Sequence, residues 1–433
     1  MLAAVRSRGR PRPAPVAIVL ATLALALAVP VGADAAERPP RLDASAWLLV
    51  DRRDEAELAT RAADARRAIA SATKLMTAHL ALTELRMGDR LTVPDYQPAP
   101  AESVAGLAAG ERLTVRDLVV AMMLPSANDA AVTVADGVAG SQGAFVEEMN
   151  RAARKLGLTR THYANPIGLD APGNYSTAND LVDLSSELLG DRRFRRIVAM
   201  PKATLTSGDR DRTVTNTNTL LLSDPSVDGV KTGHTSEAGY VLVASAKRHG
   251  VPLLAAVLGT PSEAARDAET ERLLDYGFSL YDRAEPVERD AREARVDVRY
   301  EDEPLPLLAR HGIAVRVRDD QDVEVDVERP VEVEGPIDVG DRLGSATVTV
   351  DGRFIDRTPL TAAHAIAAPT IVDRVGGPLV AALIVLAVIV ILALAAIWLR
   401  RRTAGYVSAD RDPEERLRTR DERIRRRSGD RDA

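Results

Sequence analysis

The longest uncharged stretch of the sequence lies near its C-terminus and restricts how the chain can be organised. Pro378 to Leu399 is 22 residues without one charged side chain. A helix of about 20 apolar residues is long enough to cross the roughly 30 Å hydrocarbon core of a bilayer. Trp398 lies at the end of this stretch and three consecutive Arg follow it, so the positive-inside rule predicts that residues 400–433 form a charged cytoplasmic tail.

The first 35 residues have the three parts of an export signal. Four Arg between positions 6 and 12 precede an apolar run from Val16 to Val29, and Ala33-Asp34-Ala35 offers a cleavage site. An uncleaved membrane helix is the alternative, but this run is shorter than a bilayer span requires. Under either interpretation we expect the body of the chain to lie outside the cytoplasm. With the signal cleaved, we expect a single-pass protein of the cell membrane.

The body of the chain has the composition of a folded, acidic protein. The 433 residues include 45% hydrophobic but only 3% aromatic side chains, which predicts two or three domains packed through Ala, Val and Leu. The net charge of -6 includes +3 on residues 1–35 and +4 on residues 400–433, so the part between them carries about -13. This acidity argues against nucleic-acid binding. The sequence has no Cys, which excludes disulfides and thiolate metal sites.

A serine and a lysine three residues apart begin an apolar helical pattern at Ser71-Ala72-Thr73-Lys74. Side chains at this spacing share one helix face, so the Lys74 amine can reach the Ser71 hydroxyl. A lysine kept neutral by burial can act as the base that activates a serine nucleophile. By itself the pattern is more often an N-cap serine followed by a solvated lysine.

Two further motifs contain groups suited to a cleft. Ser126 and Asn128 are two residues apart after a helical segment that Pro125 ends, where a hydroxyl and an amide can point the same way. Taken alone, such a pair is far more often ordinary turn chemistry, because Ser and Asn are common in turns. The stretch Lys231-Thr232-Gly233-His234 offers an ammonium, a hydroxyl and a closely approachable backbone, a combination suited to a carboxylate. A surface strand with a solvated lysine is the alternative.

Lysine usage favours chemical roles for Lys74 and Lys231. The sequence has five Lys against 52 Arg, so it uses Arg for almost every positive charge. Arg remains protonated at any working pH, whereas a desolvated Lys can become a neutral base or a proton carrier. Two of the five lysines nevertheless lie in the motifs.

Periodicity predicts alternating helices and strands, followed by a region of short strands. Residues 46–51, 239–246 and 253–258 are expected to form strands, and residues 165–170 a loop. Helices are expected from Ser71 toward Gly88 and over residues 113–124, 145–156 and 176–189. The short alternating runs 314–318, 323–327, 331–333 and 347–350 predict a small β domain, with a type I′ hairpin at Asp351-Gly352.

Taken together, Ser-x-x-Lys, Ser-x-Asn and Lys-Thr-Gly in this order resemble the motifs of the penicillin-recognising serine enzymes. Within that group the chain is similar to the low-molecular-mass D-alanyl-D-alanine carboxypeptidases, on the stretches 126–128, 165–170, 176–178 and 228–235. The resemblance covers about residues 45–365. Ile69-Ala70 stands where the family usually has Pro-Ala, and the membrane span replaces the family's usual amphipathic C-terminal helix.

The resemblance implies a fold and a division of the chain. The fold is of the α/β (α+β) class: an antiparallel five-stranded sheet with helices on both faces, followed by a small all-β domain and a transmembrane helix. The expected segments are a signal peptide over 1–35, a catalytic domain over 36–285, a β domain over 290–365, a linker over 366–377, a membrane helix over 378–399 and a tail over 400–433.

The resemblance also implies roles for the motif residues. Ser71 would be the acylated nucleophile, Lys74 its base, and Ser126 the proton carrier to the leaving D-alanine, tuned by Lys231. Asn128 would hold the substrate amide. Lys231 and Thr232 would bind the terminal carboxylate, with Gly233 beside them, and the backbone N–H groups of Ser71 and His234 would form the oxyanion hole.

These roles predict a membrane-anchored serine enzyme that removes the terminal D-Ala from peptidoglycan stem pentapeptides and that β-lactams inhibit covalently. No cofactor is expected, and the six His form no ligand cluster typical of a metal site. Three alternatives are a transpeptidase that uses the same acyl-enzyme, a non-catalytic peptidoglycan-binding module, and a β-lactamase. The loop 165–170 contains no Glu to serve a β-lactamase as deacylating base.

Overall fold

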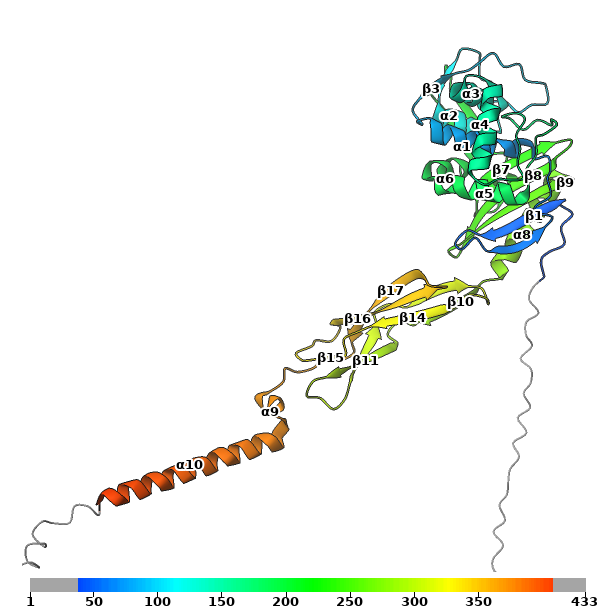
Figure 1. The fold of residues 1–433 in the computed structure, drawn as a ribbon. Coiled ribbons are helices and arrows are strands. Elements are labelled where there is room, and N and C mark those ends of the chain that lie inside the picture. The colour runs from blue at the N-terminus through cyan, green and yellow to red at the C-terminus, as the bar shows by residue number, and fades with distance from the viewer. Residues whose placement is uncertain (1–37, 408–433) are drawn as a thin grey trace, which may run out of the picture.

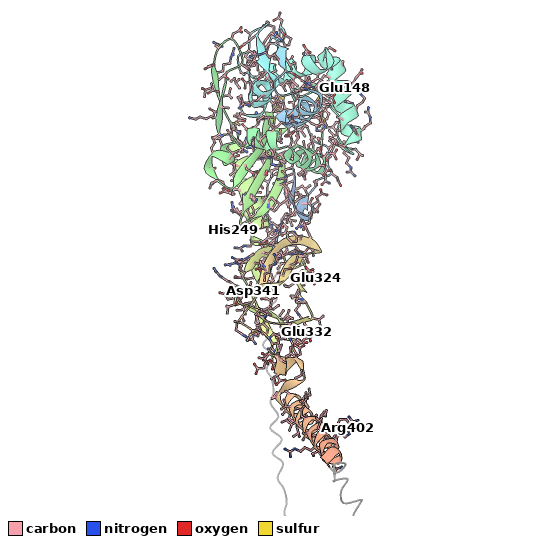
Figure 2. All side chains as sticks on the ribbon, turned by 90° about the vertical axis from the view of Figure 1, so that its left-hand side faces the viewer. Glu148, His249, Glu324, Glu332, Asp341 and Arg402 are labelled. Atoms are coloured by element: carbon pink, nitrogen blue, oxygen red, sulfur yellow. The ribbon has the colours of Figure 1, made fainter. Side chains whose placement is uncertain are left out.

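A computed structural model describes residues 38–407 of the chain, which form two folded regions and a long helix arranged in a row (Figure 1). The predicted signal over 1–35 and most of the predicted tail over 400–433 lie outside the described residues. In Figure 2, Glu148 lies toward the end of the first region that is far from the second, whereas His249 lies where the two regions meet. Arg402 lies far down the long helix.

The first region is built on a five-stranded antiparallel sheet in the order β2-β1-β9-β8-β7. Its strands are β1 (Ala46–Asp51), β2 (Glu57–Arg61), β7 (Val227–Thr235), β8 (Gly239–Arg248) and β9 (Val251–Thr260). The central strands are mostly apolar and buried because both faces of the sheet are covered. In β1, Leu48 packs into the core on one face and Leu49 into the core on the other.

Helices cover both faces of this sheet, as the family resemblance implies (Figure 1). Buried helical residues join the first core, and Leu273 and Leu274 of α8 join the second. Thr114 and Thr177 accept hydrogen bonds from backbone N–H groups at the starts of α2 and α5. The helices are α1 (Lys74–Glu84), α2 (Val115–Met123), α3 (Asn128–Ala139), α4 (Gln142–Lys155), α5 (Ala178–Gly190), α6 (Arg192–Val198), α7 (Thr219–Ser223) and α8 (Glu263–Ser279), with a 3-10 turn η1 (Ala70–Thr73) before α1.

Two small hairpins complete the first region. Strand β3 (Arg90–Thr92) pairs with β4 (Arg112–Thr114), and β5 (Lys202–Leu205) pairs with β6 (Arg212–Thr215). The loop between β3 and β4 passes beside the start of α3, where Ser103 accepts a hydrogen bond from the backbone of Asn128 at 2.7 Å.

The second region consists of strands, as the sequence predicts. A six-stranded sheet has the order β14-β16-β17-β12-β11-β15, and β10 pairs with β13. Asp351 and Gly352 both have positive φ and join β16 to β17 in the expected hairpin. The strands are β10 (Asp282–Val287), β11 (Arg292–Val298), β12 (Leu305–Ala309), β13 (Ile313–Val317), β14 (Val323–Glu328), β15 (Glu332–Val333), β16 (Arg342–Val350) and β17 (Arg353–Ala362).

Some element boundaries differ from the expectation. Ser71 lies in the turn η1 rather than in the first turn of an α-helix, and α1 ends at Glu84, ahead of Gly88. Periodicity predicted no helix at α3 or α8 and no strand at β10 or β11. Charged side chains on the exposed positions of those strands concealed their alternation.

A single long helix, α10 (Gly377–Val407), follows the second region and a short helix α9 (Ile371–Arg374). Within residues 38–407 it is the one helix long and apolar enough to cross a membrane, and its apolar side chains are exposed. It contains the predicted span 378–399 and is therefore a candidate membrane anchor.

Candidate active site

Ser71 lies where the turn η1 packs against the free edge of β7. Its side chain is half-buried, and the preceding Ala70 has a positive φ of 46°. Two glycines allow this close approach. A Cβ on Gly233 of β7 would lie 3.0 Å from the Ser71 nitrogen, and a Cβ on Gly168, whose φ is +88°, would lie 2.0 Å from the Ala70 oxygen. The backbone around Ser71 is thus held between a strand and a loop.

Lys74 is the first residue of α1 and is fully buried. Its Nζ donates to Ser71 Oγ at 2.8 Å and to the Ile167 carbonyl oxygen at 2.6 Å. Burial lowers the pKa of Lys74 well below its ordinary value, and the positive charge of Lys231 lowers it further. Neutral Lys74 would therefore present a lone pair at hydrogen-bonding distance from the serine hydroxyl.

The loop 165–170 holds the carbonyl group that Lys74 contacts. Asn165 Oδ1 accepts from the Gly168 backbone at 2.6 Å and from the Leu169 backbone at 3.1 Å, and so fixes the loop from within. Asp170, the carboxylate of this loop, accepts from Thr235 Oγ1 at 2.6 Å. Both side chains make structural contacts, and the loop positions Lys74 through its backbone.

Lys231 lies on β7 opposite Ser126 and has 1% exposure. Its Nζ donates to Ser126 Oγ at 3.0 Å and to the Thr232 carbonyl oxygen at 2.8 Å. Burial lowers the pKa of Lys231 to about 7, with a further contribution from the charge of Arg266. Ser126 itself adopts a positive φ of 63° in the short connection between α2 and α3.

The remaining part of β7 contributes Thr232, Gly233 and His234. Thr232 Oγ1 lies 2.7 Å from Thr217 Oγ1. The His234 side chain is exposed, and its ring stacks on Tyr240 with 4.0 Å between the ring centroids. The ring therefore lies against the neighbouring strand β8. The backbone of His234, rather than its ring, can contact a ligand at the free edge of β7.

Asn128 is held by residues that the sequence analysis did not single out. Its Nδ2 donates to Glu102 Oε2 at 2.7 Å, and the Tyr96 hydroxyl donates to the same oxygen. Burial alone raises the pKa of Glu102, but the hydrogen bonds from Tyr96 and Asn128 outweigh it and keep that pKa below its ordinary value. An ionised Glu102 therefore orients the Asn128 amide.

The structure brings the motif residues from separate segments of the chain into one cluster. Two hydrogen-bonded pairs, Ser71 with Lys74 and Ser126 with Lys231, form this cluster, and Asn128 follows Ser126 by two residues. Glu102 and Thr217 escaped sequence reasoning because they lie outside the three motifs and contact them only through the fold. Among the described residues no group of three His, Asp or Glu side chains is placed to hold a metal ion.

Such an arrangement suits acyl transfer. It pairs a hydroxyl with an amine whose pKa burial has lowered, and a second hydroxyl with a second such amine, at the edge of a sheet strand that can pair with a peptide. Together with the helix-covered antiparallel sheet, the cluster defines a penicillin-recognising serine enzyme.

Comparisons with known proteins identify the family. The family model described as D-alanyl-D-alanine carboxypeptidase matches residues 33–262, and the chain belongs to this family. The D-alanyl-D-alanine carboxypeptidase DacF of Bacillus subtilis is 31% identical over 335 residues, which covers 74% of this chain and 85% of the relative. The relative from Streptomyces sp. strain K15 is 39% identical over 241 residues, which covers 52% of this chain and 83% of the relative.

Solved structures agree with this assignment. Penicillin binding protein 5 from Haemophilus influenzae is 28% identical, covers 76% of this chain and 99% of its own, and has a TM-score of 0.54. The Streptomyces K15 DD-transpeptidase is 34% identical, covers 56% of this chain and 100% of its own, and also has a TM-score of 0.54. The protein is a serine-type D-alanyl-D-alanine carboxypeptidase, and its family implies peptidoglycan peptides and β-lactams as ligands.

Proposed function

We propose that Ser71 is the nucleophile of this carboxypeptidase and that neutral Lys74 takes its proton. The observation that carries this proposal is the 2.8 Å contact from Lys74 Nζ to Ser71 Oγ, made by a fully buried lysine. Ser71 Oγ then attacks the carbonyl carbon between the two D-Ala residues, and an ester on Ser71 replaces the peptide bond. Water hydrolyses this ester and releases the shortened peptide.

Ser126 delivers the proton that the leaving D-Ala nitrogen needs. Its hydroxyl lies 3.0 Å from Lys231 Nζ, and the pKa of about 7 gives Lys231 both protonation states near neutral pH. A proton lost by Ser126 to the amine can therefore be replaced from Lys231.

The free edge of β7 binds the substrate as an added antiparallel strand. Thr232 and Lys231 bind the terminal carboxylate, and Asn128, oriented by Glu102, binds a peptide amide. The backbone N–H groups of Ser71 and His234 stabilise the oxyanion, and Gly233 leaves room for the approach.

In this proposal α10 crosses the membrane and the second region separates the site from the membrane surface. We assign the catalytic domain to residues 36–281 and the β domain to 282–365, since β10 pairs with β13 of the second region. The boundary between the two domains, expected at residues 285–290, is thus assigned just after the end of α8. With α10 spanning the bilayer as one pass, the catalytic domain lies on the extracytoplasmic side, separated from the helix by the β domain (Figure 1). The tail over 400–433 lies in the cytoplasm, and the signal over 1–35 directs export.

The direct test uses a pentapeptide that ends in D-Ala-D-Ala. Protein purified without α10 should release free D-Ala, and Ser71→Ala should abolish both this release and covalent labelling by penicillin. Labelling that persists in Ser71→Ala would place the nucleophile elsewhere. A folded native protein that releases no D-Ala would contradict the proposed reaction, and release diverted to a new peptide by an added amine would identify transfer instead.

A further inference from the structure

A hollow of about 400 Å³ lies beside the proposed site, between the segment that leads to Ser71 and the loop that follows Gly168. Its lining includes two arginines, Arg66 and Arg67, and one carboxylate at the far end of β7, Glu237. All three side chains are exposed. The hollow therefore offers charges of both signs within one small volume.

The arginine side chains of the hollow are not used by the fold. Within residues 38–402, neither guanidinium is part of an ion pair or hydrogen bond, although the backbone of Arg67 pairs with Ser176. The Arg66 guanidinium carbon lies 4.8 Å from the centroid of the Tyr175 ring, which holds that side chain over the hollow. Their donors remain available to a carboxylate.

The other acidic group of the hollow is already occupied. Asp170 accepts hydrogen bonds from the Thr235 hydroxyl at 2.6 Å and from the Glu237 backbone at 3.1 Å. The Glu237 side chain has no partner among the described residues. Of the two carboxylates it is the one free to bind an ammonium group.

The proposed direction of the substrate leads into this hollow. A peptide with its terminal carboxylate at Thr232 and its scissile carbonyl at the His234 N–H runs antiparallel to β7. Its earlier residues then pass Thr235 and approach Glu237 at about 3.4 Å per residue. The residue just before the two D-Ala residues is one position from the residue that carries the scissile carbonyl. It therefore lies about 3.4 Å further along β7, and a long side chain at that position can extend toward the hollow.

We propose that this hollow is a specificity subsite for the residue that precedes the D-Ala-D-Ala pair, and that it selects a side chain ending in both a carboxylate and an ammonium group. The proposal rests on the proposed function, because that function sets the direction of the peptide along β7. Arg66 and Arg67 bind the carboxylate, and Glu237 binds the ammonium group.

The test compares two synthetic pentapeptides that differ only in that residue. One contains meso-diaminopimelate, whose side chain ends in both groups, and the other contains L-lysine, which lacks the carboxylate. The native ectodomain should show a kcat/KM for the diaminopimelate peptide that is about three- to tenfold higher, the range expected for one exposed charge-assisted contact. The difference should lie mainly in KM.

Substitution of both arginines should remove the preference. The double variant Arg66→Gln/Arg67→Gln should bring the ratio of the two kcat/KM values close to one, whereas Arg66→Lys/Arg67→Lys should keep part of it. Arg154→Gln, an exposed charge loss on α4, is the matched control and should leave the ratio unchanged. Acylation by penicillin shows in each case that the variant is folded.

The outcomes separate this subsite from the reaction itself. If the native protein releases D-Ala equally from both peptides, or if the double Gln variant keeps the native ratio, the subsite is contradicted while the proposed reaction stands. If the native protein releases D-Ala from neither peptide, the proposed reaction fails and the subsite fails with it.

Discussion

The active site and the junction of the two regions both bury basic side chains, but only those at the junction are paired with carboxylates. In the active site, Lys74 and Lys231 donate only to hydroxyl and carbonyl oxygens. At the junction of the two regions, Arg318 donates to the carboxylates of Asp51 and Asp54 at 3.2 and 3.0 Å. Within residues 38–402, every ion pair has Arg as its cation.

The acidic and basic side chains at the junction remain ionised. Burial alone raises the pKa of Asp51, but hydrogen bonds from Arg53 and Tyr281 outweigh it and hold that pKa below its ordinary value. The pKa of Arg318 is raised because its contacts with Tyr281 and acidic groups outweigh the burial that would lower it. Burial and the hydrogen bond to Asp51 raise the pKa of Tyr281 to about 12. Charges that are paired on burial remain ionised at any working pH.

In the active site, burial favours the neutral form of the two lysine amines. A buried amine without a carboxylate partner is most stable when neutral, so burial lowers the pKa of both lysines. Only a neutral amine can accept the proton of Ser71. The difference teaches that the ion pairs among the described residues use Arg, whose charge persists, whereas the two buried amines of the active site are Lys, whose charge can change.

The largest effect is expected when the buried lysine base of the active site is replaced by an arginine. Lys74→Arg keeps a positive charge but cannot release its proton, so acylation by a β-lactam should slow by about 10²- to 10⁴-fold. Stopped-flow labelling of Ser71 measures the rate. Lys155→Arg, at an exposed position of α4, is the matched control and should acylate at the native rate. Near-native acylation in Lys74→Arg would remove Lys74 from the role of base.

The next largest effect is expected when the arginine at the junction of the two regions is replaced. Arg318→Leu removes one partner of the buried Asp51 carboxylate, while Arg53 and Tyr281 remain bound to it. The loss should destabilise the contact between the regions by about 1.5–3 kcal/mol. Thermal unfolding should then separate into two transitions, while the acylation rate at 25 °C stays native. Arg342→Leu, an exposed change on β16, should leave a single transition. A slower acylation in Arg318→Leu would show that the junction acts on the active site.

A smaller effect concerns the residue that orients Asn128. Glu102→Ala removes a charge-assisted hydrogen bond and should lower kcat/KM for the pentapeptide about tenfold, whereas Glu102→Gln can still accept from Asn128 and should lose less. The negative charge of Glu102 raises the pKa of Lys74, so both variants should move the rise of acylation with pH to lower pH. A shift to higher pH would contradict this interaction.

The smallest effect is expected from the membrane end of the chain. Deletion of residues 375–433 removes α10 and leaves both regions intact, so the product should be soluble with unchanged kcat/KM. Sedimentation with membranes and D-Ala release measure the two properties. A soluble but inactive product would show that the boundary after β17 is misplaced.

The family resemblance, carried by the order of the motifs, implied the antiparallel sheet with helices on both faces. The position of the membrane helix was predicted from local hydropathy alone. Sequence reasoning could not predict α8, whose apolar positions are few, or the pairing of β10 with β13, which are far apart in the sequence. Motif spacing placed Ser71 and Lys74 together because three residues separate them. Glu102 contacts Asn128, and the Ile167 carbonyl contacts Lys74, because the fold brings distant loops together. No local sequence pattern predicts such contacts.

The protonation state of Lys74 is the central claim, and the pH dependence of acylation tests it most directly. The rate of β-lactam acylation of the native protein should rise as the amine loses its proton, with an apparent pKa well below the value of about 10.4 for an exposed lysine. Because burial lowers the pKa of nearby Lys231 to about 7, the rise belongs to the coupled pair. A rate that rises only near pH 10, or that does not rise at all with pH, would contradict a neutral lysine base.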